Sequence, residues 1–152
     1  MNTRHFGLSA CVLAVLLLVA SVFGGTEVIG QQQAPSVSNA WVRLPAATGR
    51  PGAGYMVVQG GAQADAIVGA SSPSAERIEI HSMTMDGGVM RMRAEPSVAV
   101  PAGQSVEFRP GGNHLMLFGL DPRLKPGDRV ELTLTFRSGA TAQVRAQARA
   151  AG

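Results

Sequence analysis

The methionines and histidines are the residues of this chain most able to do distinctive chemistry, and they gather in two short segments. Apart from the initiator and Met56, every methionine lies in one of these segments, as do two of the three histidines. The first segment covers residues 81–92 and reads HSMTMDGGVMRM, and the second covers residues 114–116 and reads HLM. Thioether sulfur is a soft, uncharged ligand, and imidazole is a borderline one. The two His-Met segments therefore indicate a site for a soft metal ion.

The first His-Met segment carries the sequence signal of a tight β-hairpin. A two-residue type I′ loop requires positive φ at both central positions, which Asp-Gly and Gly-Gly pairs tolerate. We expect the loop at Asp86-Gly87, with Gly87-Gly88 as the alternative. The first loop places Met92 opposite His81, and the second places it opposite Met83.

In both registers the same side chains share one face of the hairpin. Directly opposed residues point to the same side of a sheet, and so do alternate residues along a strand. A three-residue loop would instead shift the pairing by one residue and move the methionines of the second strand to the other face. The predicted face carries His81, Met83, Met85, Met90 and Met92. On a later strand, His114 and Met116 share one side in the same way.

The donor types favour a monovalent soft ion over the common divalent ions. Imidazoles and thioethers add no ligand charge, and thioethers suit Cu(I). Zinc normally recruits Cys, His or carboxylate. Calcium and magnesium need oxygen donors, and Asp86 is the only acid in the two segments. The simpler alternative is that the methionines only fill a core.

The segments that must position these donors read as short strands. From Val37 onward, β-prone runs alternate with Gly, Pro and Asp clusters, and no stretch has the 3.6-residue repeat of a helix. Residues 130–136 alternate apolar and polar side chains, as a half-buried antiparallel strand does. We expect an all-β fold, a Greek-key β-sandwich of about nine short strands. Trp41 and Tyr55 are expected in its core.

Length, charge and cysteine usage narrow the class of protein. The chain has 152 residues, enough for one domain with a real core, and a formal net charge of +3. Its basic residues form no run, so we expect no nucleic-acid partner. The only Cys is Cys11, which excludes a disulfide framework, a thiolate metal site such as blue copper, and a Cys nucleophile in the rest of the chain.

The N-terminal segment reads as an export signal. Its apolar run is densest over residues 11–23, which is too short for a spanning helix. We expect residues 1–30 to hold a signal peptide and the start of a linker, residues 31–38 to be a polar linker, and residues 39–149 to form the folded domain. The predicted location is the periplasm or another extracytoplasmic compartment, with no membrane span after signal removal.

An uncleaved signal anchor and a lipid anchor are the two alternatives for the N-terminal segment. Residues 8–11 read LSAC and look like a lipobox, whose Cys becomes lipidated. A lipobox closes the apolar core of its signal, whereas here the apolar run follows Cys11. We therefore do not expect Cys11 to carry a lipid.

The number of residues between the histidines and methionines of the two His-Met segments forms a recognisable pattern. His81 and Met92 are separated by ten residues, Met92 and His114 by twenty-one, and His114 and Met116 by one. This spacing resembles the signature of the periplasmic copper chaperones of the PCuAC family. Further segments similar to family positions are residues 39–43, 54–56, 85–92, 101–103, 110–120 and 132–136. The resemblance covers most of the chain beyond the expected signal.

The resemblance implies a cupredoxin-like β-sandwich that binds one Cu(I) per domain at an exposed site. The implied ligands are His81, Met92, His114 and Met116. It also implies that copper passes to an accepting protein, such as the dinuclear copper centre of a cytochrome c oxidase subunit, or to another copper chaperone. Met83, Met85 and Met90 are outside the signature, and we expect them either to be additional ligands or to form a sulfur-rich rim.

We therefore expect a copper carrier and not an enzyme. The sequence leaves two alternatives open: a copper buffer that protects against excess metal without a dedicated recipient, and a metal-free β-sandwich that serves adhesion or assembly. A copper redox enzyme is disfavoured, because the folded part has no thiol and no evident substrate-pocket residues.

Overall fold

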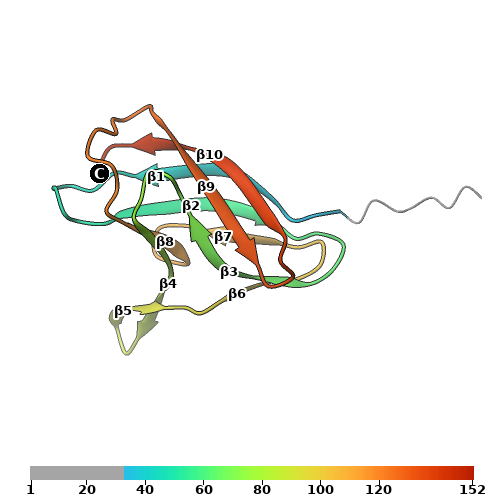
Figure 1. The fold of residues 1–152 in the computed structure, drawn as a ribbon. Helices are drawn as coiled ribbons and strands as arrows, with labels where there is room; N and C mark the ends of the chain where they lie inside the picture. The colour runs from blue at the N-terminus through green and yellow to red at the C-terminus, as the bar shows by residue number, and fades with distance from the viewer. Residues whose placement is uncertain (1–32) are drawn as a thin grey trace, which may run out of the picture. The chain divides into compact units, whose positions relative to one another are not determined.

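The structure, a computed structural model, describes residues 33–152, and the regular structure of this part is entirely β-strand (Figure 1). The predicted all-β class is confirmed, with ten strands where about nine were expected. The strands are β1 (Ser36–Arg43), β2 (Gly52–Gln59), β3 (Asp65–Ser71), β4 (Arg77–Asp86), β5 (Val89–Ala94), β6 (Val98–Val100), β7 (Ser105–Phe108), β8 (His114–Phe118), β9 (Arg129–Phe136) and β10 (Thr141–Arg149).

The strand order brings together segments that are far apart in the sequence. The order along the sheet is β5-β4-β8-β2-β1-β10-β9-β3-β6, and β7 pairs with β2 off this path. β1 and β10 pair in parallel, and the other pairs are antiparallel. β8 lies between β4 and β2, although β5, β6 and β7 separate it from β4 in the chain. This Greek-key type of connection places the second His-Met segment directly beside the first.

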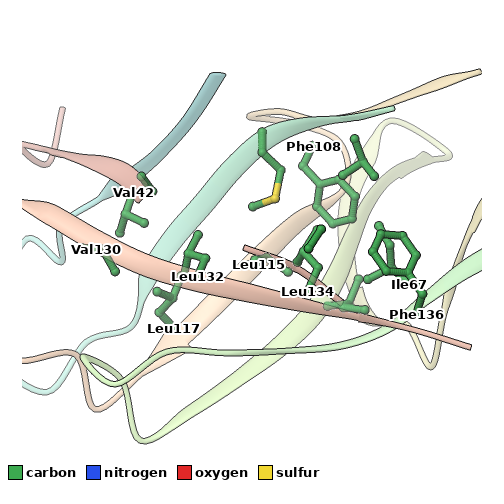
Figure 2. Packing of buried hydrophobic residues seen from close by; sticks show 14 of the residues in the cluster. Val42, Ile67, Phe108, Leu115, Leu117, Val130, Leu132, Leu134 and Phe136 are labelled. Atoms are coloured by element: carbon green, nitrogen blue, oxygen red, sulfur yellow. The ribbon is translucent and has the colours of Figure 1, made fainter. Parts of the chain in front are cut away.

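The sheet path folds into two layers packed around one apolar core. In β9 the buried residues alternate with more exposed ones, and they are Val130, Leu132, Leu134 and Phe136. Leu115 and Leu117 of β8 belong to the same cluster, and Figure 2 shows them beside the leucines of β9. Because β8 and β9 lie in different parts of the strand order, this packing closes the sheet into a sandwich.

The β4–β5 hairpin turns at Gly87-Gly88, so the expected loop at Asp86-Gly87 is wrong. Both glycines have positive φ, +57° and +81°, which residues without a Cβ adopt at no steric cost. Asp86 therefore stays in β4 as its last paired residue. The alternative register holds, in which Met92 opposes Met83.

The first strand begins inside the segment expected to be a linker. β1 starts at Ser36, which pairs with Gln59 of β2, so residues 36–38 already belong to the sheet. The expected signal peptide and Cys11 lie outside the described residues. Within residues 33–152, no helix has the length and apolarity that crossing a bilayer requires.

Candidate metal centre

The side chains of β8 alternate between the core of the sandwich and the outer face of the sheet. Leu115 and Leu117 have no exposed surface and belong to the core. His114 and Met116 alternate with them, so both project from the opposite face of the sheet. On that face Met116 lies opposite Ala53 of β2, whose small side chain leaves room beside the thioether.

β4 brings the first histidine beside the second. In the antiparallel pairing of β4 with β8, His81 is the direct partner of His114. The centroids of the two imidazole rings are 5.9 Å apart. Since opposed residues share a face, both rings lie on the outer face with Met116. The two His-Met segments are therefore adjacent in space.

A pocket of about 330 Å³ opens on this outer face. Its lining includes donors from three strands: Met83 of β4, Met90 and Met92 of β5, and His114 and Met116 of β8. Tyr55 and Arg43 supply much of the remaining wall. Four thioethers and one imidazole thus converge on one hollow.

Two of the candidate donors lie outside the lining of the pocket. His81 stands next to it, against the ring of His114. Met85 lies farther along β4, near the loop, and its exposed fraction is 65%. The sequence candidates therefore divide into a group around the pocket and a separate position near the hairpin loop.

Exposure distinguishes core methionines from surface ones. Met56 on β2 is 2% exposed and belongs to the core cluster, where its thioether fills space. Met85, Met90 and Met92 are 65%, 49% and 48% exposed. The interpretation of these three methionines as core residues is therefore wrong.

Hydrogen bonding leaves His114 with one free ring nitrogen. Its Nδ1 lies 2.9 Å from the carbonyl oxygen of Gly112, so Nδ1–H donates and the lone pair of the neutral ring is on Nε2. The same carbonyl accepts the backbone N–H of Met83 at 3.2 Å, which ties β4 to this ring. Burial lowers the pKa of His114 below 6.5, helped by His81 and Arg43 and opposed by the Gly112 hydrogen bond. The ring is therefore neutral, as a metal ligand must be.

His81 is held by an acid that the sequence reasoning missed. Its Nε2 lies 2.9 Å from Oε2 of Glu79, which also pairs with Arg77. The hydrogen bond from His81, reinforced by the charge of Arg77, lowers the pKa of Glu79 and keeps the carboxylate charged. The signal available in the sequence was strand alternation, because Glu79 precedes His81 by two residues and shares its face.

The remaining nitrogen of His81 has no hydrogen-bond partner. A neutral ring that donates from Nε2 to Glu79 carries its lone pair on Nδ1. This atom is buried and unpaired among the described residues. Buried polar atoms without a partner are uncommon and cost free energy. A soft cation beside the ring would satisfy this lone pair, so the donor set fits such an ion.

Aromatic and cationic side chains form the wall of the pocket contributed by β1 and β2. The ring centroids of Trp41 and Tyr55 are 4.4 Å apart, and the guanidinium of Arg43 lies 5.5 Å from the centre of the Tyr55 ring. Tyr55 is buried as expected, but it faces the pocket and lies outside the main core cluster. Trp41 is only partly buried and does not belong to the core cluster, so its expected place in the core is wrong. Burial raises the pKa of Tyr55, so its phenol stays neutral and offers no anionic oxygen to a metal.

The sequence matches one protein family over most of the described domain. Residues 36–148 match the family described as "Putative lipoprotein LpqE-like". A relative from Leifsonia xyli subsp. xyli, described as "Putative lipoprotein Lxx21020", is 34% identical over 139 residues. The matched region covers 91% of this chain and 80% of that relative.

Solved PCuAC domains have the same fold. The copper-bound PCuAC domain from PmoF2 aligns with a TM-score of 0.64 and 21% identity, over 78% of this chain and 95% of that domain. The Cu(I) form of DR1885 from Deinococcus radiodurans aligns with a TM-score of 0.60 and 30% identity, over 80% of this chain and 83% of that one. The expected cupredoxin-like sandwich and the resemblance to PCuAC are thereby confirmed. The chain belongs to the LpqE-like family and has the fold of the PCuAC domains.

Proposed function

We propose that this protein is an extracytoplasmic Cu(I) carrier and not an enzyme. It binds one cuprous ion through His81, Met92, His114 and Met116, and it passes the ion to a copper-accepting protein. The observation that carries the proposal is the convergence of donors on the outer face of the sheet. The two imidazoles are direct cross-strand partners, and the pocket beside them is lined by both signature methionines.

The donor set fits Cu(I) better than a divalent ion. Nε2 of His114 and Nδ1 of His81 are the ring nitrogens not engaged by Gly112 or Glu79, and an imidazole that binds a metal through such a lone pair adds no charge. The thioethers are neutral as well, and the nearest carboxylate, on Glu79, is engaged by His81 and Arg77. A site without ligand charge stabilises a monovalent soft ion more than it stabilises a divalent hard one.

The similar solved structures support copper as the cargo. The PmoF2 domain is described as copper-bound, and DR1885 as carrying Cu(I). DR1885 is 30% identical to this chain over 80% of its length, so the comparison extends beyond the fold. Together with the donor set, this supports transfer of copper to a recipient such as the dinuclear centre of a cytochrome c oxidase subunit, or to another copper chaperone.

The openness of the site supports a carrier that releases its ion by ligand exchange. Met92 is 48% exposed, so an incoming donor can approach the copper from solvent. Met83 is directly opposite Met92 and lines the same pocket, which makes a further thioether available while ligands exchange. Thioethers bind and leave without gaining or losing a proton, so the exchange needs no acid or base catalyst.

An exported location follows from the same proposal. The family and the Leifsonia relative are both described as lipoproteins, a class of exported proteins. We propose that a signal peptide within residues 1–30 directs export to the periplasm or an equivalent compartment, and that Cys11 is removed with it. The intact mass of the exported protein tests this assignment, because a retained and lipidated Cys11 would add the mass of its acyl chains.

Copper transfer to an acceptor tests the proposed function. The purified protein, loaded anaerobically with one equivalent of Cu(I), should metallate a soluble oxidase domain that carries the dinuclear site, as followed by the absorption of that centre. Deletion of the gene should lower oxidase activity when copper is limiting. Normal oxidase activity with raised copper sensitivity would indicate a buffer instead, and a titration without Cu(I) uptake would indicate a metal-free domain.

Affinity for Cu(I) should fall as the pH drops through the histidine range. Protons and copper compete for the same imidazole lone pairs, whereas the thioethers bind no proton. Because burial lowers the pKa of His114 from 6.5, the proton on this ring competes with copper only in more acidic solution. Competition with a chromophoric Cu(I) chelator at several pH values measures the effect. An affinity unchanged down to about pH 5, well below an ordinary histidine pKa, would assign binding to the methionines alone.

A further inference from the structure

The β4–β5 hairpin carries an exposed apolar surface that the inner copper site does not account for. Of the large apolar side chains exposed in residues 33–152, all but Val68 lie on this hairpin, and they are Met85, Val89, Met90 and Met92. Figure 1 shows the hairpin extending away from the two packed layers. Clustered apolar side chains that remain in water often mark a binding site, and most of these are thioethers.

The methionines of the hairpin form two cross-strand pairs. Met83 is opposite Met92, and Met85 is opposite Met90 near the loop. Opposed side chains of an antiparallel pair start from Cβ atoms about 4.5–5.5 Å apart. Each methionine is unbranched and flexible, so it can turn its sulfur toward its partner. Each pair can therefore present two sulfurs to one ion.

The two pairs differ in their surroundings. Met83 and Met92 both line the pocket beside His114. Met85 lies outside the pocket, whereas its partner Met90 lines the pocket wall. The thioethers thus form a continuous row that begins in solvent near the loop and ends beside the imidazoles.

The other face of the hairpin is mainly polar. Thr84 is opposite Arg91, and Nε of Arg91 lies 3.3 Å from the carboxylate of Asp86. Ser82 donates a 2.6 Å hydrogen bond to Glu95. The thioethers are therefore gathered on the face that continues into the pocket, and they are not scattered around the hairpin.

We propose that Met85 and Met90 form a second Cu(I) site of lower affinity, through which copper reaches and leaves the pocket. The inference deepens the proposed function and rests on it for the identity of the inner site. Thioethers select Cu(I) over harder ions, and the outer site is weaker because it has two donors and no imidazole. Transfer inward is ligand exchange: new Cu–S bonds form as old ones break, copper stays cuprous, and no proton moves.

Methyl NMR of the purified protein, with ¹³C-labelled methionine methyl groups, tests the two sites separately. Cu(I) alone is added under anaerobic conditions. The first equivalent should shift the methyl signals of Met92 and Met116, and the second should shift those of Met85 and Met90. The Met85→Leu/Met90→Leu variant should lose the second event.

The NMR outcomes separate the two proposals. A second equivalent that leaves the Met85 and Met90 methyl signals unmoved overturns the outer site and leaves the inner one standing. A first equivalent that leaves Met92 and Met116 unmoved contradicts the proposed function, whatever the hairpin does.

Release kinetics test whether the outer site lies on the route of the copper. Met85→Leu should leave the equilibrium affinity for the first equivalent unchanged and slow its release to a chromophoric chelator by about tenfold. Leucine preserves volume and apolar character, so a surface that only docks a partner would show no change. Met56→Leu in the core is the matched control and should release copper at the normal rate. Equal rates for Met85→Leu and the unmodified protein would overturn the relay.

Discussion

Replacing Met92 and Met116 together with leucine should abolish measurable binding of Cu(I). The two residues bring thioethers to the pocket from different strands, and leucine has no lone pair to offer. Loss of an outer partner of a metal ligand already costs about 10- to 100-fold in affinity. Loss of two ligands should therefore exceed about 100-fold, as measured by anaerobic competition with a chromophoric Cu(I) chelator.

The fold of this double variant should persist. Met92 is 48% exposed, and Met116 lies on the outer face of β8. Swaps of methionine for leucine conserve volume and usually cost less than about 1.5 kcal/mol even in a core. Met56→Leu controls for the loss of a methionine elsewhere. Unchanged affinity in the double variant would show that the ligand set is wrong and would point to Met83 and Met90, which line the same pocket.

Leu115→Ala should lower the thermal midpoint of unfolding by about 10 °C or more. Leu115 has no exposed surface and packs in the single core cluster of the sandwich. Truncation of a buried leucine typically costs about 2–5 kcal/mol, because the cavity left behind adds to the lost burial. Calorimetry of the metal-free protein measures the change.

The copper affinity of Leu115→Ala should nevertheless stay close to that of the unmodified protein at temperatures where the variant is folded. Leu115 faces the core, whereas its neighbours His114 and Met116 face the pocket. The double methionine variant should show the reverse pattern, with binding lost and stability kept. A large loss of affinity in folded Leu115→Ala would mean that the two faces of β8 are not independent.

Strand alternation made the donor face of the hairpin predictable from the sequence. The two candidate loops differ by one position, which shifts the pairing by two residues and so leaves the same side chains on the same face. The choice between them was harder, because Asp-Gly and Gly-Gly both tolerate positive φ. Two glycines at the loop leave Asp86 extended in β4, and this settles the register that opposes Met83 to Met92.

The pairing of β4 with β8 has no local signal in the sequence. It depends on a connection that runs through β5, β6 and β7 before the chain returns, and only the resemblance to PCuAC implied it. The place of Tyr55 at the pocket was missed for the same reason. Tyr55 reaches the pocket because β2 lies next to β8, a pairing with no local signal. The contact of His81 with Glu79 is different, because alternation along β4 already places these two side chains on one face.

β5 is the terminal strand in the sheet order of the described domain. A strand at the edge of a sheet offers its backbone to other chains, and flat apolar edges promote aggregation. Arg91 and Arg93 alternate with Met90 and Met92 along β5, and charged side chains at an edge discourage further strand addition. The exposed methionines of the β4–β5 hairpin can therefore face solvent while the arginines of β5 oppose polymerisation through this edge.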